Sequence, residues 1–318
     1  MKAKGPILLL ITALLWGMAF VAQTEAAQSV DPFTFNFSRN FIGALFLTGV
    51  IAFRKRAGQD IAPGIKPERP DGTQSEGYTR RALIIGGTLC GIALCVASYL
   101  QQAGITAYPP EAAASGRAGF VTATYMVMVA VMMIFVGKRP HFLVWTSVLV
   151  AIVGMYFLCV PDGLGSVYVG DWLVLASALG YAIHIIVIDR YTRIDGVRLS
   201  RVQLIVAGVI SLVFALIFEH PSMSMVLAAA IPILYAGICS DGIAYTFQII
   251  AQKTTDATVA SIIMSLESVF AALGGWLILS ESLSPVELGG CALVFAAVML
   301  AQAPEFIEAR RTRQKAIE

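Results

Sequence analysis

Long runs of apolar residues recur along nearly the whole chain, and short polar segments separate them. A helix of roughly 18 or more apolar residues is long enough to cross a hydrocarbon core of about 30 Å. The pattern therefore predicts an all-α integral membrane protein with about ten transmembrane helices. They are expected near residues 6–26, 33–53, 82–103, 116–136, 142–160, 170–189, 202–219, 226–248, 258–279 and 285–303.

Composition supports lipid as the surrounding solvent. The 318 residues are 58% hydrophobic and only 13% charged, whereas soluble domains are about 25% charged. The segment 54–81 is the one substantial loop, and its prolines, glycines and mixed charges indicate a solvated linker. The basic residues form no stripe with interleaved aromatics, so nucleic acid is not an expected partner.

The distribution of lysine and arginine predicts the orientation. Cytoplasmic loops carry an excess of positive charge. With the N-terminus inside, every basic residue except Arg39 and Arg117 falls in a cytoplasmic segment. This arrangement predicts that both termini lie in the cytoplasm, with the chain in the plasma membrane.

The second half of the chain weakly repeats the first. Leu14-Leu15-Trp16-Gly17 lies over Leu179-Gly180-Tyr181-Ala182, and Tyr99-x-x-Gln102 lies over Tyr245-x-x-Gln248. Each unit holds five predicted spans, an odd number, so the second copy must enter the membrane from the opposite side. The prediction is two inverted five-helix repeats, 1–160 with the loop 54–81 and 161–318 with a short basic tail, as in many secondary transporters.

Three segments carry a resemblance to a known family. They are Ala13-Leu14-Leu15-Trp16-Gly17-Met18-Ala19-Phe20, the Gly170-Asp171-x-Leu173 start of the sixth span, and the stretch from Ser265-Leu266-Glu267-Ser268 to Ser280-Glu281-x-Leu283. Over nearly its full length the chain resembles the ten-helix EamA-type branch of the drug/metabolite transporter superfamily. The resemblance implies a carrier that exports or exchanges amino acids and other small metabolites.

Glu267 is the first candidate for a transport residue. The stretch Thr258–Leu279 is otherwise free of charge, and an ionisable group at membrane depth is expensive unless it has a function. A carboxylate here can bind a substrate amine or carry a proton between two access states. The alternative is a structural role, accepting hydrogen bonds from neighbouring helices.

Two polar stripes lie at corresponding positions of the two halves. Asp241, Tyr245 and Gln248 share one face of the eighth span, and Tyr99 and Gln102 occupy the matching face of the third. We expect both helices to line a central cavity, although contacts between helices require the same residue types. Asp241 has the further alternative of contact with cytoplasmic water.

Four more residues complete the candidate substrate site. The guanidinium of Arg117 is expected either to bind a substrate carboxylate through two nitrogens or to extend to the outer membrane interface. His184 is either a proton carrier or a hydrogen-bonded core residue, and Trp16 and Tyr125 are expected cavity walls. Arg39 is expected to be structural, paired with Glu25 or Asp31.

The sequence contains no enzyme signature. It has no GxSxG, GxxxxGK[ST] or HExxH motif, its three histidines are scattered, and its cysteines lack metal-ligand spacing. We therefore expect no catalytic residues, metal or cofactor. The leading hypothesis is a secondary carrier coupled to a gradient such as that of H⁺, with a homodimer compatible with its small-residue helix faces. An integral-membrane enzyme and a membrane scaffold or receptor without flux are the alternatives.

Overall fold

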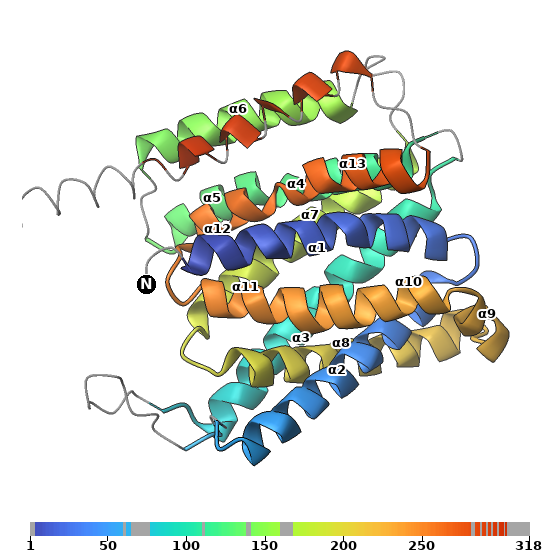
Figure 1. The fold of residues 1–318 in the computed structure, drawn as a ribbon, viewed down its shortest axis with the longest axis vertical. Helices are drawn as coiled ribbons and strands as arrows, with labels where there is room; N and C mark the ends of the chain where they lie inside the picture. The colour runs from blue at the N-terminus through green and yellow to red at the C-terminus, as the bar shows by residue number, and fades with distance from the viewer. Residues whose placement is uncertain are drawn as a thin grey trace, which may run out of the picture.

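The computed structural model describes residues 4–59, 62–64, 77–109, 112–137, 141–159, 168–280 and, with single-residue gaps, 284–303. This part of the chain is all-helical and contains no strand. Some of the long helices run across the view in Figure 1, and others cross it obliquely. The all-α prediction is confirmed for these residues.

Eight helical segments are long and apolar enough to cross a membrane. Five are continuous or nearly so: α1 (Lys4–Ala26), α2 (Pro32–Arg56), α3 (Arg80–Thr106), α7 (Val169–Arg190) and α8 (Gly196–Phe218). Three are composite: α4 (Ala114–Ala123) with α5 (Tyr125–Phe135), α10 (Ala230–Tyr235) with η2 (Ala236–Ala244) and α11 (Tyr245–Ala251), and α12 (Ala257–Met264) with α13 (Glu267–Ile278).

The remaining helices are shorter. The helix α6 (Phe142–Cys159) coincides with the predicted fifth span, α9 (Met223–Ala228) is a short helix after α8, and an apolar helix over Leu288–Ala301 coincides with the predicted tenth. The described residues thus contain eight candidate membrane spans, and the total of ten remains a prediction.

The surface of the bundle suits a lipid environment. Large apolar side chains are strongly exposed on several helices, for example Leu45 at 73% and Ile231 at 82%. Polar side chains such as Gln248 and Ser268 are fully buried instead. A lipid solvent accounts for this arrangement, because apolar side chains are stable against hydrocarbon whereas polar groups need partners inside the protein.

The main helix contacts join the first half of the chain to the second. The helix α3 packs against α7 and α8, α2 packs against α8 and η2, and α1 packs against α11 and α13. Glycines permit several close crossings, since a Cβ on Gly91 would lie 2.7 Å from the carbonyl oxygen of Gln203. A Cβ on Gly17 would likewise lie 2.7 Å from the carbonyl oxygen of Glu267. The second crossing brings α1 directly against the start of α13.

In two of the composite spans, a hydroxyl side chain at the break donates a hydrogen bond to a backbone carbonyl of the same helix. At the α4–α5 break, the hydroxyl of Thr124 donates to the carbonyl of Val121 at 2.6 Å. Next to the α12–α13 break, the hydroxyl of Ser265 donates to the carbonyl of Ile262 at 2.7 Å. Such local bonds compete with the helical ladder and bend helices. The first residues after the two breaks are Tyr125 and Glu267.

Candidate functional site

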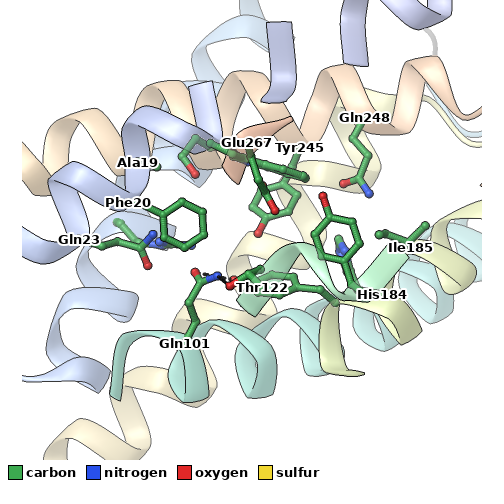
Figure 2. A pocket seen from close by; sticks show the side chains of 15 residues that line it. Ala19, Phe20, Gln23, Gln101, Thr122, His184, Ile185, Tyr245, Gln248 and Glu267 are labelled. Carbon is green, nitrogen blue, oxygen red and sulfur yellow. Dashed lines mark hydrogen bonds between the residues drawn. The ribbon is translucent and has the colours of Figure 1, made fainter. Parts of the chain in front are cut away.

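A cavity lies inside the bundle where both broken spans meet α1, α7 and α11. Its lining comprises Trp16, Ala19, Phe20, Gln23, Arg39, Gln101, Thr122, Tyr125, Tyr181, His184, Ile185, Ser240, Tyr245, Gln248 and Glu267. In Figure 2, Glu267 points into the middle of this ring of side chains, between Phe20 and Gln248. The cavity volume is about 30 Å³, which is room for about two water molecules. Little free space is therefore left in the site in this structure.

Glu267 reaches the cavity because the helix breaks beside it. The side chain is the first of α13 and belongs to a residue that is only 2% exposed. The carboxylate interacts with the hydroxyl of Tyr125, and no ion pair joins it to a basic side chain in the part of the chain described here. A buried carboxylate without a counter-ion is unstable in a low dielectric medium.

Arg39 and Asp241 form an ion pair at the edge of the cavity. The Nε atom of Arg39 lies 3.2 Å from Oδ2 of Asp241, and the two side chains are 3% and 0% exposed. Asp241 lies in the π-helix η2, a conformation that is often found at functional sites. The predicted pairing of Arg39 with Glu25 or Asp31 is wrong, because α2 packs against η2 and turns Arg39 toward it. The burial of Asp241 also excludes its contact with water in this conformation.

A hydrogen-bonded chain crosses one wall of the cavity. The amide of Gln101 donates to the hydroxyl of Thr122 at 3.0 Å, and the hydroxyl of Tyr181 donates to Oε1 of Gln101 at 3.1 Å. The dashed line in Figure 2 marks the first of these bonds. This chain links α3, α4 and α7 and holds three polar side chains at the cavity surface.

On the opposite wall, Trp16 and Tyr245 pack ring against ring. Their centroids are 4.9 Å apart, and the indole nitrogen of Trp16 donates to the carbonyl of Ser240 at 3.4 Å. His184 contacts Tyr245 edge to face at 5.5 Å and is hydrogen-bonded to Gln203 at 3.0 Å. His184 therefore has the bonded partner expected of a core histidine and also faces the cavity.

Six of the ten residues singled out in the sequence line this cavity, namely Trp16, Tyr125, His184, Tyr245, Gln248 and Glu267. Asp241 does not line the cavity itself but is paired with Arg39, which does. Tyr99 and Gln102 do not line it. The ring of Tyr99 stacks on Phe33 at 3.8 Å, and the amide of Gln102 donates to the carbonyl of Gln23 at 3.1 Å. The adjacent residue Gln101 takes the cavity position instead.

Arg117 lies away from the cavity and holds a carboxylate of the chain itself. Its Nε and Nη2 atoms lie 2.7 and 2.8 Å from the two carboxylate oxygens of Asp171. Asp171 also accepts from the hydroxyl of Tyr108 and the amide of Tyr168, both at 2.8 Å. The fork predicted for a substrate carboxylate is thus occupied by Asp171, and it ties α4 to the start of α7.

A second forked ion pair lies at the other end of the bundle. Arg54, at the end of α2, contacts Asp195 through two nitrogens at 3.1 and 3.2 Å. Asp195 caps the start of α8 by accepting from the amide of Arg198 at 3.1 Å. Each end of the bundle therefore has one arginine from the first half bound to one aspartate from the second half.

Among the described residues, the sequence analysis missed eight cavity positions, namely Ala19, Phe20, Gln23, Gln101, Thr122, Tyr181, Ile185 and Ser240. Gln101 and Thr122 carry ordinary polar side chains that any helix contact uses, so no pattern separated them from structural residues. Tyr181 was recoverable, because the internal repeat places it over Trp16. No group of three or more histidine, cysteine or acidic residues in the described ranges could hold a metal ion.

Comparison with known proteins gives consistent results. The model of the EamA-like transporter family matches residues 3–160 and again residues 168–302. An uncharacterized transporter of Archaeoglobus fulgidus is 29% identical over 298 residues, which cover 92% of this chain and 83% of the relative. The uncharacterized transporter YoaV of Bacillus subtilis is 24% identical over 295 residues, covering 90% and 92%. A crystal structure that is 18% identical covers 95% of this chain and 99% of its own, with a TM-score of 0.73, and shows the same fold.

Proposed function

Because the chain belongs to the EamA-like transporter family, we propose that it is a secondary carrier that exports or exchanges small organic metabolites by alternating access. Amino acids and related compounds are the class from which its substrates come. The observation that carries the proposal is the small internal cavity where two broken spans meet, with Glu267 at its centre. Broken helices at mid-membrane are typical of substrate sites in secondary transporters.

In this proposal, alternating access results from movement of the two halves of the chain relative to each other. The family model matches the chain twice, and the two breaks precede Tyr125 in the first half and Glu267 in the second. We take the halves to be five-helix repeats of opposite orientation, 1–160 and 161–318, with both termini in the cytoplasm of a plasma-membrane protein. Rocking of one repeat against the other then exposes the site to each side in turn.

The forked ion pairs at the two ends serve as closures. Arg117 precedes Tyr125 by eight residues, about 12 Å along a helix, and Arg54 follows Arg39 by fifteen residues, about 22 Å. The cavity thus lies between Arg117–Asp171 and Arg54–Asp195. Both pairs are formed in this structure, which agrees with the small cavity volume. Transport requires each pair to open while the other stays closed.

An apolar layer supports one of these closures. Phe20, which lines the cavity, packs in one cluster with Ile105, Tyr108 and Val174. Tyr108 in turn donates its hydroxyl to Asp171. The layer connects the cavity to the Arg117–Asp171 pair, so the two must move together when this end opens.

Counterflow in reconstituted vesicles tests the proposal. The purified protein is placed in liposomes loaded with an unlabelled metabolite, and uptake of the same labelled metabolite is followed with and without a proton gradient. Saturable uptake that internal substrate stimulates is the expected result. Persistent absence of counterflow across amines, amino acids and organic acids would contradict the carrier and favour a scaffold or receptor.

A further inference from the structure

The charged groups around the cavity do not balance. Arg39 lines the cavity but is already paired with Asp241, and Glu267 remains without an ionic partner in the described part of the chain. With these three groups ionised, the site carries one net negative charge. His184 does not change this, because a neutral imidazole is sufficient for its hydrogen bond to Gln203.

We propose that the cavity selects monovalent organic cations with an apolar body, such as amines, and that Glu267 is their counter-ion. The inference rests on the proposed function and narrows its substrate class. A positive charge on the ligand stabilises the Glu267 carboxylate, for which the protein supplies no counter-ion. It also explains why a carboxylate is placed in a cavity whose other polar groups are neutral or paired.

The aromatic side chains around Glu267 support the same ligand chemistry. Rings from four different helices line the cavity: Trp16 and Phe20 from α1, Tyr125 from α5, Tyr181 from α7 and Tyr245 from α11. The face of an aromatic ring is negative and attracts cations, most strongly in a site that excludes water. An amine or quaternary ammonium group is therefore stabilised both by the carboxylate and by the rings.

Unpartnered polar atoms provide a second, independent indication of a ligand. The Gln248 side-chain amide is fully buried, and neither its oxygen nor its nitrogen has a hydrogen-bond partner. The Tyr125 hydroxyl and Oε1 of Glu267 are likewise buried and have no hydrogen-bond partner besides each other. All three residues line the cavity. Buried polar groups are normally satisfied, so an N–H donor ligand that bonds to acceptors at these positions removes an unfavourable term.

Anions and zwitterions fit the site less well. A carboxylate on the ligand would meet Glu267, and the guanidinium in the cavity wall would have to leave Asp241 to bind it. Arg117 offers no help, because it holds Asp171 outside the cavity. The arrangement therefore favours a cation over an amino acid that shares the same apolar body.

A matched set of four ligands tests the charge preference. Phenethylamine, 3-phenylpropanol, phenylalanine and 3-phenylpropionate carry a cation, no charge, a zwitterion and an anion on similar phenyl-bearing chains. Their binding to the full-length protein in nanodiscs is measured by isothermal titration calorimetry. We expect the amine to bind about tenfold more tightly than the alcohol, and the propionate to bind least.

The variant Glu267→Gln separates charge recognition from folding. We expect it to weaken phenethylamine binding about tenfold, one counter-ion contact, and to leave 3-phenylpropanol binding unchanged. Unchanged binding of the alcohol also shows that the variant is folded. Glu25→Gln is the matched control, because Glu25 is exposed and lies outside the cavity lining, and it is expected to bind all four ligands like the parent protein.

Two results would overturn the inference. One is phenylalanine or 3-phenylpropionate binding at least as tightly as the amine, and the other is no binding of the amine at all. Counterflow distinguishes these failures from failure of the carrier proposal. Counterflow of phenylalanine without preference for the amine retains the carrier and removes the cation preference, whereas no counterflow of any ligand removes both.

Discussion

The cavity and the two ends of the bundle use charge in different ways. At the ends, each aspartate meets an arginine fork, with Asp171 bound to Arg117 and Asp195 bound to Arg54. In the cavity, one carboxylate is left over, because Arg39 neutralises Asp241 and nothing described neutralises Glu267. Paired charges join helices of the two halves, whereas the unpaired charge is available to a ligand. Four experiments, in descending order of expected effect, test this division.

The largest effect is expected from breaking the buried pair at the cavity edge. Arg39→Leu alone or Asp241→Leu alone leaves an uncompensated charge in the membrane interior, which costs about 3 to 5 kcal/mol. Each single variant should therefore show a lower thermal midpoint and a lower monodisperse yield in fluorescence-detected size-exclusion chromatography. The double variant removes both charges and should recover most of that stability. A double variant as unstable as either single one would contradict pairing of these two residues.

The second-largest effect is expected on transport and not on stability. Glu267→Gln should lower counterflow about tenfold or more, because the amide cannot serve as a counter-ion, while the folded yield changes little. Glu25→Gln, on an exposed position of α1, should change neither. Equal losses of transport and yield in Glu267→Gln would assign this residue a structural role.

A smaller effect is expected at the end of the bundle. Arg117→Ala removes an ion pair whose two side chains are only 14% and 13% exposed, so this end should open more often. A cysteine at Ala19 in the cavity, in a background without the five native cysteines, should then react several-fold faster with an impermeant maleimide.

Exchanging the charges provides the control for this experiment. The double variant Arg117→Asp/Asp171→Arg restores an attractive pair and should slow the labelling again. Labelling that stays fast in the exchanged variant, or stays slow in Arg117→Ala, would show that this pair does not close the route.

The smallest effect distinguishes two neighbouring glutamines. Gln101→Ala removes the bonds to Thr122 and Tyr181 in the cavity wall and should raise the KM for transport about two- to threefold, in keeping with the loss of neutral hydrogen bonds. Gln102→Ala removes a contact to the backbone of α1 and should leave the KM unchanged. The opposite ranking would restore the sequence-based assignment of Gln102 to the cavity.

The fold could be predicted from the sequence further than the site. Eight spans were recoverable because lipid imposes a minimum apolar length on each helix. Predicting the site required knowing how each helix is rotated about its axis, which hydropathy does not specify. Gln101 and Gln102 are consecutive, and successive residues of a helix point about 100° apart, so only packing of α3 decides which one faces the cavity.

Arg39 illustrates a second limit of prediction from the sequence, which concerns the partners of buried charges. Its position inside an apolar span was evident, but its partner, Asp241, lies 202 positions away in the sequence and the two meet through contact of α2 with η2. Glu267 was identifiable because a lone carboxylate in an apolar run needs no partner to stand out. Isolated charges can thus be found from sequence, whereas paired charges need the tertiary contact.

The π-helix η2 makes the site sensitive to how this segment is wound. Its nine residues are wound more widely than an α-helix, so the same number of residues turns through a smaller angle. If η2 rewound as an α-helix at the same length, each of its residues would turn through about 100°, and the helix beyond it would rotate. Tyr245 and Gln248 would then leave the cavity together. A change of winding in this segment therefore alters a whole wall of the cavity at once, whereas a point substitution in the lining changes one side chain.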